Sequence, residues 1–105
     1  MRQLDKYLNI MDKAFRALAD PTRRRILALL RDGDLPAGEI AAEFPMAWAS
    51  VSHHLQILKD AELVLARRDG QFIRYSLNTT VFQDALQHLM ALAPAKRRKG
   101  DGHRA

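Results

Sequence analysis

The spacing of apolar residues predicts a mainly helical chain. Apolar side chains recur every three or four residues, the spacing of one helix face, from Leu4 to about Ala19 and again over residues 80–93. Asp20 and Pro21 suit the N-cap and first position of a second helix, which is expected to run to about residue 31 and to stop at Gly33. A short strand at residue 35, a third helix over residues 36–44 and a fourth over residues 49–61 complete the expected helical part.

Residues 63–77 have the pattern of a β-hairpin. Two runs, 63–68 and 71–77, flank Asp69-Gly70, a dipeptide suited to the positive φ values of a two-residue turn. Pairing Arg68 with Gln71 would then divide the side chains between two faces. The expected core face holds Val64, Ala66, Ile73, Tyr75 and Leu77, and the other face holds Arg67, Phe72 and Arg74. Two guanidinium groups on one face suit a phosphate backbone as their partner.

The helix over residues 49–61 has two faces of different chemistry. Val51, Leu55 and Leu58 share the apolar face, with His54 and Ala61 at its edge. The opposite face carries small or polar side chains on the first two turns: Ala49, Ser52, His53 and Gln56. Side chains of this kind, in this place, are those with which a recognition helix meets base edges in the major groove of DNA.

These motifs together resemble a known family. SVSHHLQILKDAELV followed by a basic hairpin with an Asp-Gly tip, and LADPTRRRILALLRDGDLPAGEIAAEF before it, are similar to the ArsR/SmtB-type winged-helix repressors over roughly residues 14–77. The cysteine-free, short form is most similar to the SdpR-like autorepressor branch of that family. The resemblance implies a mainly α fold with a small β-hairpin, namely a winged helix-turn-helix of about five helices plus a two- or three-stranded wing. The chain departs from the pattern at Glu62, where many members have glycine, and at Ala47 and Ala49 in the turn.

The length of 105 residues indicates one domain, expected over residues 1–93 and followed by a basic, disordered tail over residues 94–105. The tail accounts for most of the net charge. Its five basic residues and one acidic residue contribute +4 of the formal +5, so the folded body is only +1. Bulk charge is therefore weak evidence for nucleic-acid binding, and the local basic clusters must carry that argument.

The first and last helices carry more apolar surface than the core of a small monomer requires, because a single apolar stripe per helix would cover it. A second copy would bury the surplus, so a homodimer through the first and last helices is expected. Two recognition helices related by a two-fold axis would then read an inverted repeat. The alternative is that both helices wrap one large core.

The expected function is sequence-specific binding of double-stranded DNA by a homodimeric repressor. The expected DNA-binding residues are Ala49, Ser50, Ser52, His53, Gln56, Arg67, Arg68 and Arg74. Gln56 suits adenine, whose N6 and N7 a carboxamide can bind together, whereas Ser50 and Ser52 suit phosphate. His54 is expected to pack in the protein, and packing is also favoured for Trp48. Arg23, Arg24 and Arg25 could serve as surface ion-pair partners or as phosphate contacts.

Two other functions fit the sequence less well than DNA binding. An enzyme built on Ser52, His53 and His54 fails on geometry, because the adjacent helical side chains of Ser52 and His53 point about 100° apart and cannot form a nucleophile and base pair. A winged helix that docks proteins would instead show an apolar or acidic recognition face. No catalytic residue or cofactor is therefore expected.

A metal-responsive repressor is a further alternative that the resemblance suggests. The chain has no cysteine, and its last helix offers only Asp84 and His88 as a pair of ligands on one face, so no metal is expected. The N-terminal residues lack the apolar run of a secretory signal, which favours the cytoplasm and no membrane contact. The sequence does not identify an effector.

Overall fold

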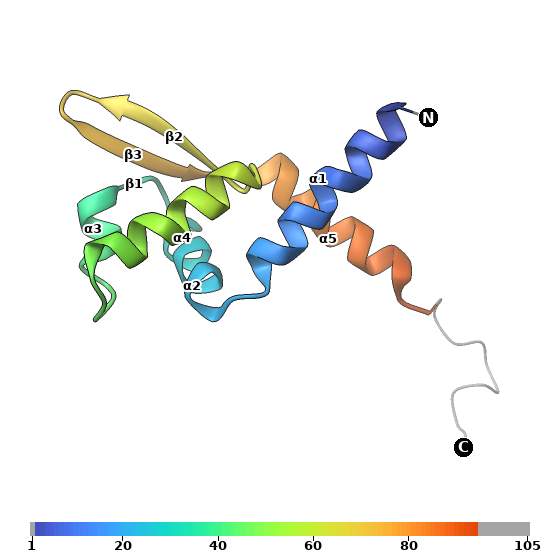
Figure 1. The fold of residues 1–105 in the computed structure, drawn as a ribbon, viewed down its shortest axis with the longest axis horizontal. Coiled ribbons are helices and arrows are strands. Elements are labelled where there is room, and N and C mark those ends of the chain that lie inside the picture. The colour runs from blue at the N-terminus through green and yellow to red at the C-terminus, as the bar shows by residue number, and fades with distance from the viewer. Residues whose placement is uncertain (1, 95–105) are drawn as a thin grey trace, which may run out of the picture.

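The computed structural model describes residues 2–94 as a helical body with a β-hairpin that projects from it (Figure 1). Five helices and a three-stranded antiparallel sheet of order β1-β3-β2 make up this part of the chain. The elements in chain order are α1 (Arg2–Leu18), α2 (Pro21–Leu30), β1 (Leu35–Pro36), α3 (Ala37–Ala41), α4 (Trp48–Asp60), β2 (Val64–Asp69), β3 (Phe72–Leu77) and α5 (Thr79–Leu92). The winged helix-turn-helix expected from the sequence is confirmed. The predicted tail, apart from Pro94, lies outside the described residues.

One buried cluster joins every helix of the described chain. Its largest fully buried side chains are Met11, Ile26, Ile40, Leu55, Leu58, Leu63, Val51 and Val64. They come from α1 to α4, from Leu63 in the turn after α4 and from the first residue of β2, while α5 contributes the buried Ala85. Burial of apolar surface from all five helices fixes the positions of α3 and α4, which form the helix-turn-helix.

The second helix begins where the sequence indicated. The Asp20 carboxylate accepts a hydrogen bond from the backbone N–H of Arg23 at 3.1 Å, and Pro21 occupies the first turn. Asp20 is thus an N-cap that satisfies one of the free N–H groups at the start of the helix. The predicted third helix was too long, because α3 ends at Ala41 and residues 42–47 form the turn before α4.

The predicted hairpin register was wrong by two residues. Asp69 pairs with Phe72, so the two-residue loop is Gly70-Gln71 and not Asp69-Gly70. Gly70 has φ +64°, and among the described non-glycine residues only Glu62 has a positive φ. A type II′ turn needs a positive φ at its first position alone, which glycine supplies without strain, whereas the predicted turn would have forced Asp69 into that region. A shift of two preserves the division of side chains between the faces, so Arg67 and Arg74 still share a face and now pair directly.

The terminal helices cross and pack against each other (Figure 1). The His88 ring of α5 lies against two rings of α1, with centroids 6.1 Å from Tyr7 and 5.6 Å from Phe15. Both helices nevertheless leave large apolar side chains exposed, namely Leu4, Tyr7, Leu8, Leu86, Leu89, Met90 and Leu92. None of the helices in residues 2–94 is long and apolar enough to cross a lipid bilayer.

Helix α4 ends in a turn in which a non-glycine residue, Glu62, has a left-handed backbone conformation. Glu62 has φ +61°, its N–H donates to the Lys59 carbonyl at 2.9 Å, and the Leu63 N–H donates to the Leu58 carbonyl at 3.0 Å. This pair of hydrogen bonds is the Schellman motif, in which the left-handed position normally holds glycine. Glu62 therefore adopts a conformation that costs an L-residue about 1 to 2 kcal/mol.

We expect Glu62→Gly to raise the free energy of unfolding by about 1 kcal/mol, because glycine adopts this φ without strain and loses part of the gain through its freer unfolded state. Urea unfolding at a fixed protein concentration measures the change. Glu62→Ala separates the backbone effect from the removal of an acidic group at a helix C-terminus, and it should stabilise much less. Lys59→Gly, inside the same helix, should destabilise by about 1 kcal/mol. A loss of stability in Glu62→Gly would contradict the assignment of strain to this residue.

Candidate nucleic-acid interface

The exposed face of α4 is small and polar along its first three turns. Ala49, Ser50, Ser52, His53 and Gln56 are all exposed, while Val51, Leu55 and Leu58 on the other side are buried. The helix starts without a side-chain cap, because its N-cap residue is Ala47. The Ser50 and Val51 N–H groups donate to the Ala47 carbonyl at 3.0 and 3.2 Å, so the N–H groups of Trp48 and Ala49 are the ones left for an outside acceptor such as a phosphate oxygen.

Gln56 is held in place by an acidic neighbour one turn along. Its Nε2 donates to the Asp60 carboxylate at 2.8 Å. A carboxamide has two N–H donors and a carbonyl oxygen, so one N–H and the oxygen of Gln56 stay open. One donor and one acceptor are the groups needed to bind N7 and N6 of adenine.

A partly buried polar network connects α4 to the end of α1 and the start of α2. Nη1 of Arg23 lies 3.2 Å from Nδ1 of His54, and the same guanidinium donates to the Ala17 carbonyl at 2.8 Å and the Arg16 carbonyl at 3.1 Å. Arg23 thus satisfies carbonyl groups at the end of α1 while it holds His54, whose side chain is 18% exposed. The expectation that His54 packs within the protein is confirmed, and Arg23 serves as a structural residue.

The carboxylate of Asp20 completes this network. Its pKa lies below the ordinary value of 3.8, first because the Arg23 backbone N–H donates to the ionised form, and also because of the charges of His54 and Arg23. Oδ2 of Asp20 is 3.8 Å from Nδ1 of His54. Because the pKa of Asp20 is lowered in the folded protein, the ionised carboxylate stabilises the fold at neutral pH. This contribution is lost as the pH falls below the ordinary value and through the lowered pKa.

The other two arginines of the Arg23-Arg24-Arg25 cluster also have partners within the protein. Arg24 donates to the Leu18 carbonyl at 2.8 Å, and the Arg25 guanidinium lies 5.6 Å from the centre of the Phe44 ring. Neither contact is one of the two roles, a surface ion pair or a phosphate contact, that the sequence left open for the cluster.

The wing carries its arginines on both faces. Arg67 and Arg74 are direct cross-strand partners on one face, whereas Arg68 pairs with Ile73 on the other face and reaches the Gly70 carbonyl at 3.3 Å. Like charges directly opposite each other destabilise a hairpin. Asp69 offsets part of this repulsion, because its Oδ2 accepts a hydrogen bond from Nε of Arg74 at 3.1 Å.

Two exposed aromatic residues adjoin this surface and were not among the expected DNA-binding residues. Trp48, the first residue of α4, is 53% exposed, so the packing favoured from the sequence is wrong for it. Phe72 is 62% exposed and lines a shallow hollow together with Arg74, Pro36, Gly38 and Glu39. The sequence contained a signal for each residue. Trp48 stands at the start of the recognition helix, and Phe72 stands on the face of the wing that carries Arg67 and Arg74.

This arrangement of helix and wing matches a family of regulators. The family described as "Bacterial regulatory protein, arsR family" matches residues 20–65, which hold α2, β1, α3, α4 and the start of the wing. The chain is also 54% identical over 80 residues to the transcriptional repressor SdpR of Bacillus subtilis, an alignment that covers 76% of this chain and 89% of that protein. The chain belongs to the ArsR family.

Two further proteins are similar to this chain over most of its length. The HTH-type transcriptional regulator CmtR of Mycobacterium tuberculosis is 41% identical over 80 residues, which cover 76% of this chain and 68% of CmtR. A solved homodimeric winged helix-turn-helix DNA-binding domain from Mycobacterium bovis superposes with a TM-score of 0.71 at 30% identity and covers 87% of this chain and 86% of its own. The similarity to the Mycobacterium bovis domain extends over most of α1 to α5.

Proposed function

We propose that this ArsR-family protein is a homodimeric transcriptional repressor that binds an inverted-repeat operator in the cytoplasm. The observation that carries the proposal is the juxtaposition of an exposed, small and polar α4 face with a wing whose two paired arginines share one face. The helix face lacks bulk and can enter a major groove. SdpR, with which the chain shares 54% identity, is named a transcriptional repressor.

Each element has a separate task in this proposal. Gln56 reads a base through its carboxamide, and Ala49 and His53 contact base edges from the same helix face. Ser50 and Ser52 bind phosphate near the start of α4. On the wing, Arg67, Arg68 and Arg74 bind the sugar-phosphate backbone.

Repulsion between the paired arginines of the wing supports this role. The Arg67–Arg74 pair costs stability in the free protein, and only Asp69 lies within ion-pair distance of Arg74 among the described residues. A phosphate placed between the two guanidinium groups would turn that repulsion into attraction on both sides. The pair is thus suited to an anionic partner outside the protein.

The exposed apolar side chains of α1 and α5 support the dimer. Leu86, Leu89 and Met90 recur at helical spacing on α5, and Leu4 and Leu8 do so on α1. Burial of these side chains against a second copy would remove a contiguous apolar patch from water. The two-fold axis of such a dimer would set two α4 helices about one turn of DNA apart, or a multiple of it, so the operator half-sites should have the same spacing.

Selection of bound genomic fragments at near-physiological salt tests the proposal. We expect the recovered fragments to share an inverted repeat, because a two-fold protein reads the same half-site twice. Fluorescence anisotropy with the repeat and with a scrambled duplex of equal length then measures specificity, which should reach about 1,000-fold or more. Recovery of unrelated sequences with equal affinities would refute a repressor of this kind and would favour the protein-docking alternative.

No metal takes part in this proposal. Within residues 2–94, no group of three or more His, Cys, Asp and Glu side chains is placed to hold a metal ion. The ring of His88, the residue that the sequence pairs with Asp84, packs between Tyr7 and Phe15.

A further inference from the structure

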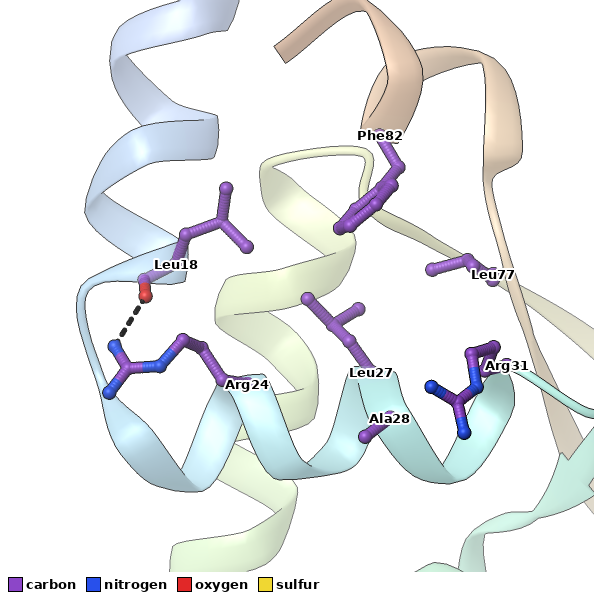
Figure 2. A pocket seen from close by; sticks show the side chains of 7 residues that line it. All are labelled: Leu18, Arg24, Leu27, Ala28, Arg31, Leu77 and Phe82. Atoms are coloured by element: carbon purple, nitrogen blue, oxygen red, sulfur yellow. Dashed lines mark hydrogen bonds between the residues drawn. The ribbon is translucent and has the colours of Figure 1, made fainter. Parts of the chain in front are cut away.

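A cavity of about 300 Å³ lies between the end of α1, the outer face of α2 and the start of α5 (Figure 2). Its lining is mostly apolar and consists of Leu18, Leu27, Ala28, Leu77 and Phe82, with Arg24 and Arg31 at its ends. The volume is at the lower end of the range for small-molecule sites, about 300 to 1,000 Å³. No residue of the recognition helix or of the wing arginines lines it.

Two residues of α2 and its C-cap residue, Arg31, give the cavity its floor and its charge. Arg24, Ala28 and Arg31 are spaced by four and three residues, so they lie on one helix face. Ala28 is exposed and small, which leaves the space between the two arginines open. Figure 2 shows Arg24 turned toward the end of α1 and Arg31 at the opposite end of the cavity.

The charge of Arg24 has no counter-ion near it. Its Nη1 donates to the Leu18 carbonyl oxygen at 2.8 Å, which holds the guanidinium at the cavity but leaves its charge intact. Among the described residues, no carboxylate oxygen lies within 4.0 Å of Arg24, whereas Arg31 has Asp32 at 3.9 Å. An anion entering the cavity therefore meets an oriented, uncompensated cation at the Arg24 end.

We propose that this cavity binds a medium-chain fatty-acid carboxylate. The hydrocarbon chain lies on Leu27 and Phe82, across the space above Ala28, and the carboxylate accepts hydrogen bonds from Arg24. The apolar lining excludes a small polar anion as the preferred ligand, and the guanidinium distinguishes a carboxylate from a neutral chain of equal length.

A second copy of the chain is a poorer occupant than a small molecule. The exposed apolar residues assigned to the dimer, among them Leu4, Leu8, Leu86 and Met90, do not line the cavity. The cavity instead joins those helices to α2, because Leu18 ends α1 and Phe82 lies in the first turns of α5. A ligand here would touch α1, α5 and α2, and α2 packs against the recognition helix α4. This is a position from which binding can couple to the spacing of the two recognition helices. This coupling rests on the proposed function, whereas binding itself does not.

Isothermal titration calorimetry of the full chain with decanoate and with decanol tests the proposal. We expect one decanoate per chain and at least about ten-fold weaker binding of decanol, because decanol cannot form a charge-assisted hydrogen bond with Arg24. Arg24→Gln should weaken decanoate binding about ten-fold and leave decanol binding unchanged. Arg25→Gln removes the same charge from the same helix outside the cavity, and it should leave decanoate binding unchanged.

Ala28→Leu fills the cavity from an exposed helical position and should abolish binding of both ligands. Because Ala28 lies away from α4 and the wing, this variant without ligand should bind the operator as tightly as the unmodified protein does. Loss of ligand binding and loss of operator binding are therefore measured as separate results. Equal affinities for decanoate and decanol, or decanoate binding that survives Ala28→Leu, would overturn the proposal. A monomeric Ala28→Leu variant without ligand, measured by analytical ultracentrifugation, would show that a second copy occupies the cavity and would also overturn it.

Discussion

Replacement of Met90 by glutamate is expected to convert the dimer into monomers and to abolish specific operator binding. Met90 is 65% exposed and follows Leu86 and Leu89 on the same apolar face of α5. A carboxylate there would be buried without a partner, at a cost of about 3 to 5 kcal/mol, and the two-fold axis applies that cost twice. Sedimentation velocity at micromolar concentration should give a monomer, and operator affinity should fall by about 100-fold or more.

Gln87→Glu is the matched control for the dimer prediction. Gln87 is exposed on the same helix but lies to the side of the apolar face, so the same charge there should leave dimer and operator binding intact. Since Met90 is mostly exposed in the single chain, the thermal unfolding of a Met90→Glu monomer should remain cooperative. A fully dimeric Met90→Glu protein would place the interface elsewhere and would contradict the assignment to α1 and α5.

Replacement of Gln56 by alanine is expected to cost about 1 to 3 kcal/mol at one base position in each half-site and to relax specificity there. The reason is that Gln56 keeps a donor and an acceptor free beside its hydrogen bond to Asp60. Arg74→Ala should instead weaken all sequences alike and reduce the slope of log affinity against log salt by about one, because Arg74 would bind phosphate. Anisotropy titrations with the operator and with single-position variants, at several salt concentrations, measure both effects.

Asp69→Asn provides a control for the wing. It removes the carboxylate that holds Arg74 at 3.1 Å, keeps the size of the side chain, and should strengthen binding to every sequence because one competitor of the phosphate is gone. Gln56→Glu keeps the size of Gln56 and removes its amide donors, so it should disfavour adenine as Gln56→Ala does. If Gln56→Ala weakened all sequences equally and Arg74→Ala changed base preference, the two roles would be reversed.

The helix pattern and the division of side chains between faces could be read from the sequence. Burial of Val51, Leu55 and Leu58, with Ser52 and Gln56 left exposed, follows from helical periodicity alone. The faces of the wing were predicted correctly although the register was wrong, because strand side chains alternate with a period of two and the error was also two. Periodicity is a local property, so it survives errors in the longer-range pairing.

The tertiary structure decided which partners the polar side chains take. Arg23 could be a phosphate contact in the sequence, but the end of α1 and His54 surround it once α1, α2 and α4 pack together. Trp48 was expected to pack, yet the neighbouring elements leave it exposed. The left-handed conformation of Glu62 arises because the chain must turn from α4 into β2 while Leu63 and Val64 are buried, and that requirement outweighs the preference of the residue itself. Packing between different elements of the chain determines these contacts and conformations, and the spacing of apolar residues along the sequence does not specify that packing.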